Sequence, residues 1–470
     1  MSQRSWIAVA CIVGIALRFF GCGVHSLWFD ETMTVHIARS ADLTSVLERD
    51  RNPPLAFSAF RVWGEIFGWS ERVLRVLPAT LSSLAMLILT RASMQTLGAR
   101  VGLSVAWLLA VCPRNVWFAQ EVRTYAFVEF GCALAISGAL FFVQRPSMPR
   151  RACAAIAAGT AIAFGSHYTS YGLVPAILVY VRLADAERSA RRILPVTASL
   201  AIGILLWSPW LMRVLPLQLS NDWGHAPRPG WTDLVSMPMR LLVAHSGGLE
   251  CAAPHLIAAC SGLVLVIGVF GVRRVYERSR GGAFLAASCA SALVMFVVSQ
   301  TSFRGFMPRY LYASQLLMLL FLSSVVSGAV SRASRFGVAV RIAFAGLVAC
   351  FAVISVSQKT RDLREGYAPA FAAVVQNFVD GDAIVSITST FEGFSEAPAT
   401  YYLRNDERLL RAIVPEHRVF AVLPKRLHVV FREAPYSWPL WFRLMKEYRV
   451  LESRPEQNRV RYVYAALKGT

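Results

Sequence analysis

Long apolar runs separated by short polar connectors fill most of the chain up to about residue 358. A membrane-spanning helix needs roughly 20 mostly apolar residues, and about eleven runs approach that length. They lie near residues 6–23, 72–90, 101–113, 126–144, 152–166, 171–181, 193–215, 254–272, 283–300, 310–330 and 339–357. The pattern predicts a mainly α, polytopic membrane bundle. The number of spans is uncertain by one or two, because three of the runs are short.

The first apolar run has two interpretations. The basic start "MSQR" is typical of a secretory signal peptide. Arg18 inside the run, and the lack of an Ala-x-Ala-like exit, favour an uncleaved span instead.

The connector at residues 24–70 is longer than most, and two of its segments have amphipathic helical patterns. The segments are "ETMTVHIARS" and "LAFSAFRVWGEIFG", separated by the helix-breaking pair Pro53 and Pro54. Trp63, Phe67 and Trp69 suit a position at a membrane interface. We therefore expect short interfacial helices in this outward loop.

A different pattern begins at about residue 359. The segment "YAPAFAAVVQNFV" predicts a helix, and "DAIVSIT", "LHVVFRE" and "RVRYVYAAL" predict strands. All the lysines of the chain also lie here, namely Lys359, Lys425, Lys446 and Lys468. We predict a transmembrane bundle over residues 1–358 and a small soluble α/β domain over residues 359–470.

Composition and charge support a membrane protein over the soluble classes. The chain is 56% hydrophobic and 16% charged, whereas soluble domains are about 25% charged. A net charge of +20 is compatible with nucleic-acid binding, but much of the arginine lies in short clusters between apolar runs, as topology signals do. The nine cysteines lie in or beside apolar runs without CxxC spacing, so we infer neither a disulfide framework nor a zinc site.

The arginines also orient the bundle. Connectors 91–100, 145–151, 182–192, 273–280 and 332–341 hold 16 Arg in 46 residues, whereas the opposite connectors hold 10 Arg in 110 residues. The positive-inside rule places the Arg-dense side and the N-terminus in the cytoplasm. Residues 24–70 and the C-terminal domain therefore face outward.

Chemistry-bearing residues gather in the outward connectors. Asp30 and Glu31 follow the first run in "HSLWFDETMTV", and Asp50 precedes "RNPPL". Further polar residues at the outward ends of later runs are Glu71, Arg75, Gln120, Glu121, Arg123, Tyr125, His167, Tyr168, Arg309 and Tyr310. Each alone has an ordinary explanation, such as an acid at a helix N-terminus or an Arg reaching headgroups. Their concentration on one face from six segments favours a functional site.

The motifs that carry these residues resemble those of the GT-C integral-membrane glycosyltransferases. In order, they are W-x-D-E, D-x-N-P-P-L, S-E-x-x-L-R-x-L-P, Q-E-x-R-x-Y, H-Y-T and P-R-Y-L. The chain looks most like the bacterial branch related to protein mannosyltransferases and to the lipid A aminoarabinose and galacturonic acid transferases. The resemblance covers about residues 5–330 well and the C-terminal domain loosely.

The resemblance implies transfer of a sugar from a polyprenyl-phosphate donor on the outer face of the bacterial inner membrane. It maps the catalytic or acceptor-orienting acid onto Asp30, with Glu31 beside it, and the acid of the proline loop onto Asp50. Relatives often have His before the proline pair, where this chain has Asn52, which weakens the case for a metal on that loop.

Physical reasoning about the reaction agrees with this implied site. A phosphate is already a good leaving group, so one base suffices, with cations to hold the developing negative charge. We expect Asp30 to take the acceptor proton with inversion at the anomeric carbon, and Glu31 to orient the acceptor or share a divalent ion. For the donor phosphate we expect Arg123, Arg309, Tyr125, Tyr310 and His167, with Tyr168, Gln120, Asp50 and Arg75 as further substrate contacts. For Arg75, structural pairing with Glu71 is favoured slightly over a role at the donor.

Three questions stay open from the sequence. Asp30, Glu31, Asp50, His167 and His225 carry suitable metal ligands, but no spacing is diagnostic. A lipid-linked sugar flippase or transporter would also place polar groups at membrane depth, although no internal repeat is evident. A non-catalytic envelope assembly protein is the other alternative, and the acceptor is a lipid, a glycan or a protein.

Overall fold

The computed structural model describes most of the chain. The described residues are 2–49, 52–145, 147–185, 190–219, 228–242, 254–275, 280–301, 305–330, 335–360, 366–387, 395–415, 418–432, 438–455 and 460–469. They form two compact units. The bundle unit contains residues 1–20, 44–56 and 75–361, and the sheet unit contains residues 21–43, 57–74 and 362–470.

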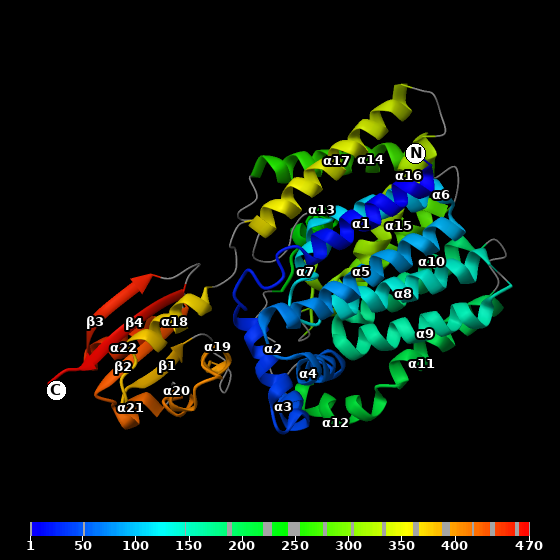
Figure 1. The fold of residues 1–470 in the computed structure, drawn as a ribbon. Coiled ribbons are helices and arrows are strands. Elements are labelled where there is room, and N and C mark those ends of the chain that lie inside the picture. The colour runs from blue at the N-terminus through cyan, green and yellow to red at the C-terminus, as the bar shows by residue number, and fades with distance from the viewer. Residues whose placement is uncertain are drawn as a thin grey trace. The chain divides into compact units, whose positions relative to one another are not determined.

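Helices dominate the chain before residue 361 (Figure 1). They are α1 (Gln3–Phe19), α2 (Phe29–Arg39), α3 (Leu43–Arg49), α4 (Leu55–Phe67), α5 (Glu71–Thr96), α6 (Ala99–Val111), α7 (Pro113–Phe118), α8 (Tyr125–Gln144), α9 (Pro149–Ser166), η1 (Tyr168–Gly172), α10 (Leu173–Ala184), α11 (Ala190–Leu205), α12 (Ser208–Leu219), α13 (Trp231–Leu242), α14 (Pro254–Val275), α15 (Arg280–Val298), η3 (Pro308–Tyr310), α16 (Tyr312–Val330) and α17 (Arg335–Thr360). Every apolar run predicted from the sequence is helical in the structure, which confirms a mainly α chain.

The predicted number of spans is not confirmed. Among the described residues, four helices are long and apolar enough to cross a membrane, and a fifth span results if α11 and α12 count as one bent segment. That pair bends by 53°. Pro209 follows the break, and because proline lacks an N–H and clashes with the preceding turn, it cannot continue the α11 hydrogen-bond ladder.

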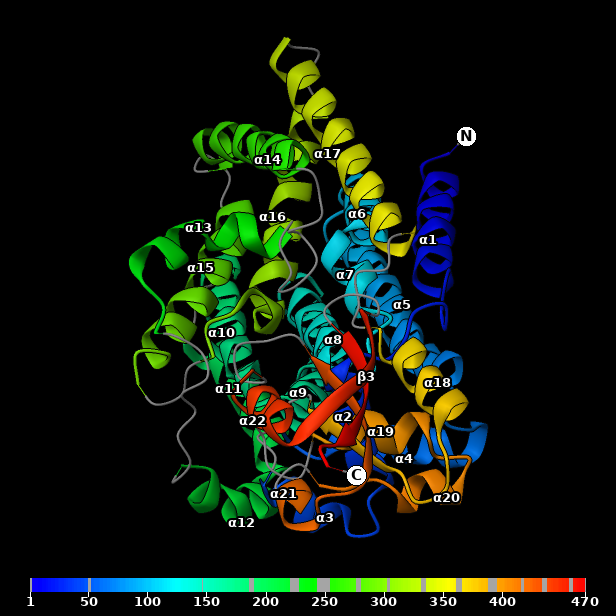
Figure 2. The same ribbon diagram turned by 90° about the vertical axis from the view of Figure 1, so that its left-hand side faces the viewer.

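Small residues let helices of the bundle unit pack closely. α8 and α9 lie side by side in both views (Figures 1 and 2), and α10 packs beside α15. A Cβ placed on Gly159 would lie 2.5 Å from the backbone nitrogen of Ala135 and 2.5 Å from the carbonyl oxygen of Gly131. Only glycine permits this approach, and small residues at such positions are typical of helix pairs in membranes.

The sheet unit contains a four-stranded sheet in the order β1-β2-β4-β3. Its strands are β1 (Ala383–Ile387), β2 (Arg426–Arg432), β3 (Tyr448–Pro455) and β4 (Val460–Leu467). β1 pairs parallel with β2, and the other pairs are antiparallel. The accompanying helices are α18 (Tyr367–Asn377), α19 (Ala397–Tyr402), α20 (Glu407–Arg411), α21 (Val419–Val422) and α22 (Trp438–Glu447).

The predicted C-terminal α/β region is confirmed in its main elements, namely α18, β1, β2 and β4. β3 was not predicted, because most of its side chains are exposed and its sequence "YRVLESRP" lacks a clean apolar alternation. Alternation along the other strands supplies a core on each face of the sheet. Ile384 and Val430 join one core, whereas Val385 and Val429 join the other.

The first loop contributes to the sheet unit. Its two predicted amphipathic helices form as α2 and α4. Phe29 of α2 is buried in the same core as Tyr367 and Phe371 of α18, and α2 packs against α19. The predicted boundary at residue 358 remains a prediction, but the compact unit that holds the sheet also includes residues 21–43 and 57–74.

Candidate active site

Asp30 and Glu31 lie in the first turn of α2 but have different surroundings. Glu31 is fully buried, and its Oε2 accepts a hydrogen bond of 3.2 Å from the backbone N–H of Trp28. This contact satisfies one of the N–H groups that a helix start leaves without a partner. Asp30 is half-buried, and its backbone carbonyl accepts a hydrogen bond of 2.9 Å from Thr34 Oγ1. Glu31 therefore holds the helix start, and Asp30 is the more accessible acid.

The backbone just before these acids is fixed by a second set of hydrogen bonds in the sheet unit. The Leu27 N–H donates to the Tyr402 hydroxyl at 2.8 Å, and it lies 3.2 Å from Glu71 Oε1. The Tyr402 hydroxyl in turn donates to Glu71 Oε1 at 2.8 Å. Glu71, which the sequence placed among the outward polar residues, thus anchors the approach to Asp30.

In the bundle unit, aromatic and cationic residues from three connectors lie close together. The rings of His167 and Tyr310 lie 4.5 Å apart, and those of Tyr125 and Tyr310 lie 6.3 Å apart. Arg309 Cζ lies 5.0 Å from the centre of the Tyr310 ring. Arg123, mostly buried, is close enough to affect His167 electrostatically.

Two arginines supply positive charge to this group, and the Glu121 carboxylate lies close enough to Tyr125 to act on it electrostatically. Burial, together with the charges of Arg123 and Arg309, lowers the pKa of His167 to about 3. His167 is therefore neutral at physiological pH. Its Nδ1 accepts a hydrogen bond of 3.2 Å from the Thr169 N–H. Two guanidinium groups beside a neutral imidazole and two phenols form an arrangement that favours an anion.

Other predicted site residues have structural partners. The Gln120 amide nitrogen donates to the carbonyl oxygens of Arg18 and Phe20 at 2.8 and 2.7 Å, at the C-terminal end of α1. The Tyr168 hydroxyl accepts a hydrogen bond of 3.1 Å from Trp210 Nε1. Arg75 is buried in α5. Asp50 and His225 lie outside the described residues.

The sequence reasoning missed a buried polar network in the bundle unit. Arg114 Nη1 donates to Gln315 Oε1 at 2.8 Å, and Gln315 Nε2 donates to Asn115 Oδ1 at 2.8 Å. Asn115 Nδ2 then donates to Glu129 Oε1 at 2.6 Å. All these side chains are fully buried. The available signal was a single polar residue inside an apolar run, which is costly and rare at membrane depth.

A second buried arginine lies in α1. Arg18 Nε donates to Ser82 Oγ at 2.9 Å, and Arg18 Nη2 donates to the carbonyl oxygen of Leu109 at 2.9 Å. Because a buried cation needs such partners, Arg18 joins α1 to α5 and α6. Its role is in packing the bundle.

Metal ligands do not cluster in the part of the chain that the structure describes. Among those residues, no group of three or more His, Cys, Asp or Glu side chains is arranged to hold a metal ion.

Comparison with known proteins identifies the fold. Residues 51–212 match the model of a family described as dolichyl-phosphate-mannose-protein mannosyltransferase. The apo structure of ArnT from Cupriavidus metallidurans aligns with a TM-score of 0.65 and 13% identity, over 99% of this chain and 98% of that one. The same protein bound to undecaprenyl phosphate aligns with a TM-score of 0.61 and 13% identity, over 98% of both chains. A search of curated proteins finds no match.

The matched region and the shared fold agree with the motif order read from the sequence. Several apolar helices long enough to span a bilayer, within a fold shared with ArnT, identify a multi-pass membrane protein. The resemblance predicted from the six motifs is thus confirmed: residues 51–212 match the mannosyltransferase family model, and the whole chain shares the fold of ArnT.

Proposed function

We propose that this protein is a glycosyltransferase that moves a sugar from a polyprenyl-phosphate donor to a lipid, glycan or protein acceptor. The observation that carries the proposal is the group of Arg123, Arg309 and a neutral His167 in the bundle unit. Its positive charge suits a phosphate. The ArnT relative that binds undecaprenyl phosphate supports a polyprenyl carrier.

In the proposed reaction, Asp30 removes the proton of the acceptor hydroxyl as its oxygen attacks the anomeric carbon. The bond from that carbon to the donor phosphate breaks, and the polyprenyl phosphate leaves with the electron pair. Attack opposite the leaving group inverts the anomeric configuration. One carboxylate suffices because the leaving phosphate needs no proton.

The donor phosphate gains negative charge as it leaves, so its ligands stabilise the transition state more than the ground state. Arg123 and Arg309 carry out this role, with the Tyr125 and Tyr310 hydroxyls and His167 as hydrogen-bond partners. Arg75, Asp50 and Tyr168 are further substrate contacts in the proposal. Glu31 and Gln120 act as positioning residues, because their side chains hold the starts or ends of helices.

The proposed setting is the bacterial inner membrane, with the N-terminus in the cytoplasm and residues 359–470 in the periplasm. The distribution of arginine between connectors supports this orientation. Cysteine labelling in intact cells tests it, because a single cysteine introduced at exposed Asp42 should react with an impermeant reagent and one at exposed Arg150 should not.

The purified protein in nanodiscs tests the proposed activity. With a polyprenyl-phosphate sugar and membrane extract as acceptor, we expect release of free polyprenyl phosphate together with a glycosylated product. A flippase would move the intact donor across vesicles and release no lipid phosphate, which would contradict the proposal. Arg123→Ala and Arg309→Ala should raise the donor KM, whereas Arg411→Ala on exposed α20 should leave it unchanged.

Mass spectrometry identifies the substrate. Envelope lipids and glycans from a deletion strain should lack one sugar that the parent strain carries. The transfer assay in nanodiscs, repeated with excess chelator, tests the role of a divalent ion. Transfer that persists in chelator removes the ion from the mechanism.

A further inference from the structure

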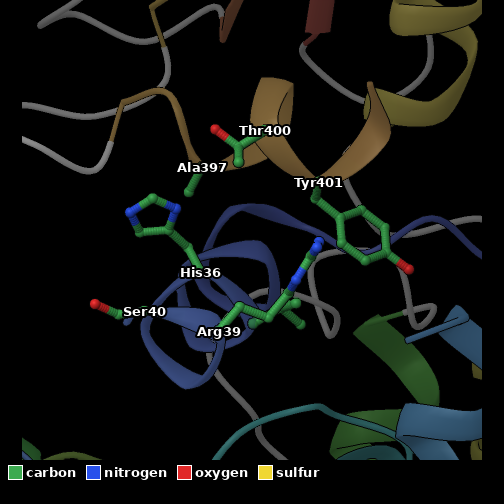
Figure 3. A pocket seen from close by; sticks show the side chains of 7 residues that line it. His36, Arg39, Ser40, Ala397, Thr400 and Tyr401 are labelled. Carbon is green, nitrogen blue, oxygen red and sulfur yellow. The ribbon is translucent and has the colours of Figure 1, made fainter. Parts of the chain in front are cut away.

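The sheet unit contains a polar pocket between α2 and α19 that the proposed reaction does not use (Figure 3). Its volume is about 240 Å³, equal to about eight water molecules at roughly 30 Å³ each. Its lining residues are Val35, His36, Arg39, Ser40, Ala397, Thr400 and Tyr401. The pocket is therefore large enough for a small charged group with its hydrogen-bond donors.

Positive charge dominates this pocket. Arg39 is exposed at the C-terminal end of α2, with its Cζ 5.6 Å from the centre of the Trp69 ring. Arg404 Cζ lies 4.2 Å from the centre of the Tyr401 ring, and partial burial together with the charge of Arg404 lowers the pKa of Arg39. Among the described residues that line the pocket, none carries a carboxylate.

The C-terminal end of a helix would ordinarily oppose an anion through its carbonyl groups. At α2 this effect is reduced, because Arg61 Nη1 donates to the carbonyl oxygen of Ser40 at 3.1 Å. Arg61 also pairs with Glu65, at 3.1 Å. The guanidinium of Arg61 therefore lies at the end of α2 that borders the pocket, where it offsets the negative end of the helix dipole.

Neutral donors complete the pocket. Burial and the charge of Arg39 lower the pKa of His36, so its imidazole is neutral near pH 7. Thr400 supplies a hydroxyl from α19, and Figure 3 shows His36 directed toward Ala397 and Arg39 beside Tyr401. The Tyr401 hydroxyl is used elsewhere, since it donates to the carbonyl oxygen of Trp69 at 3.1 Å.

We propose that this pocket binds an oxyanion, a phosphate or carboxylate group carried by the acceptor, with Arg39 as its main ligand and Thr400 and His36 as hydrogen-bond partners. The assignment to the acceptor rests on the proposed function. It follows from α2 itself, because this one helix carries Asp30 in its first turn and Arg39 in its last. A rise of about 1.5 Å and a turn of about 100° per residue separate them by about 14 Å along the helix and place them on opposite sides of it. An acceptor whose hydroxyl lies at Asp30 therefore passes around α2 to bring its anionic group to Arg39.

The test uses the full chain in phosphatidylcholine nanodiscs, titrated with inorganic phosphate by calorimetry. Every titration is repeated with Arg123→Ala and Arg309→Ala present, so that the proposed donor-phosphate ligands do not supply the signal. Saturable binding should weaken by about tenfold in Arg39→Gln, because charge-assisted hydrogen bonds are the strong ones. Arg39→Lys and Thr400→Val should weaken it less. Arg411→Gln, a control in the same unit whose Arg pairs with exposed Glu407, should bind like the wild type.

Absence of phosphate binding by the wild type, or unchanged binding by Arg39→Gln, would overturn the site. A repeat in nanodiscs with phosphatidylglycerol separates the possible sources of the anion. Loss of phosphate affinity there would assign the pocket to bilayer headgroups and overturn the acceptor assignment.

Transfer kinetics then connect the pocket to the reaction. Arg39→Gln should raise the acceptor KM and leave the donor KM unchanged, and an equal change in both would overturn the acceptor assignment. If the wild type transfers no sugar, the proposed function fails, but the phosphate titration still decides whether the pocket is an oxyanion site.

Discussion

Two adjacent acids have separate tasks at the residue scale. Glu31 is buried and accepts the Trp28 N–H, whereas Asp30 is half-buried in the same helical turn. The two adjacent acids of this motif therefore differ in role: Glu31 stabilises the start of α2, and Asp30 is the candidate base. Sequence reasoning favoured Asp30 for the base but had no means to assign the cap.

Replacement of Glu31 should affect folding first. Glu31→Ala removes the acceptor of the Trp28 N–H and should destabilise the start of α2 by about 1 kcal/mol. Hydrogen exchange of residues 29–39 should speed up, and transfer should fall in parallel. Loss of transfer with unchanged exchange would contradict this role and give Glu31 a direct part in the chemistry.

A buried histidine in the sheet unit should make that unit sensitive to acid. Burial lowers the pKa of His428 despite the opposing effect of Asp382, whose Oδ2 lies 3.0 Å from Nε2. In the neutral form, Nδ1 accepts a hydrogen bond from the Tyr462 hydroxyl at 3.0 Å. Protonation would remove that acceptor, so the stabilisation is complete above about pH 6.5 and declines as the pH falls below it.

Hydrogen exchange of β2 and β4, corrected for the intrinsic effect of pH, measures this decline in the full chain. Exchange should accelerate below about pH 6.5, and His428→Gln should reduce the dependence on pH. The neighbouring charges Arg426 and Glu452 are present in both proteins. An identical pH profile for the variant would contradict the assignment to His428.

At the element scale, some parts of the structure follow from local pattern and others do not. The apolar runs became helices because about 20 apolar residues in sequence have few alternatives in a bilayer. β3 was not predicted because most of its side chains are exposed, so its sequence shows no regular alternation of apolar and polar residues. Arg123 and His167 were found at run ends, where polar residues are conspicuous. Arg114, Glu129 and Gln315 were missed because each lies within or beside an apolar run. The sequence does not show which helices bring these side chains into contact.

The buried network joins three helices, so its central residue should matter for the bundle. Asn115 of α7 bonds Glu129 of α8 and Gln315 of α16. Asn115→Leu leaves both partners buried without these bonds, at a cost of about 1–3 kcal/mol for each group. We expect a lower melting temperature in detergent. Ser324→Ala, whose hydroxyl donates to the Leu320 carbonyl oxygen of its own helix, should change it little.

At the scale of the whole molecule, the sheet unit combines segments far apart in sequence. Residues 21–43 and 57–74 share it with residues 362–470. This arrangement was not predictable from one sequence, because hydrophobic periodicity shows that a face is buried but not against which segment. It changes the expectation for the C-terminal region, which supports α2 through Phe29 and Tyr402.

Removal of residues 362–470 should therefore abolish transfer by loosening α2. Tyr402→Phe tests the same link mildly, because it deletes the hydroxyl between Leu27 and Glu71 but retains the ring. A loss of about 0.5–1.5 kcal/mol at this partly buried hydrogen bond should speed up exchange in residues 27–39. Full transfer by the truncated protein would contradict this dependence.

The most direct test of the proposed mechanism is sugar transfer by Asp30→Asn in nanodiscs. The variant keeps the shape of the side chain but removes the base, so we expect kcat to fall by about 10²–10⁴-fold with donor binding retained. Asp42→Asn, the same change at an exposed position of the same unit, should transfer at the wild-type rate. Near wild-type transfer by Asp30→Asn would contradict the assignment of Asp30 as the base.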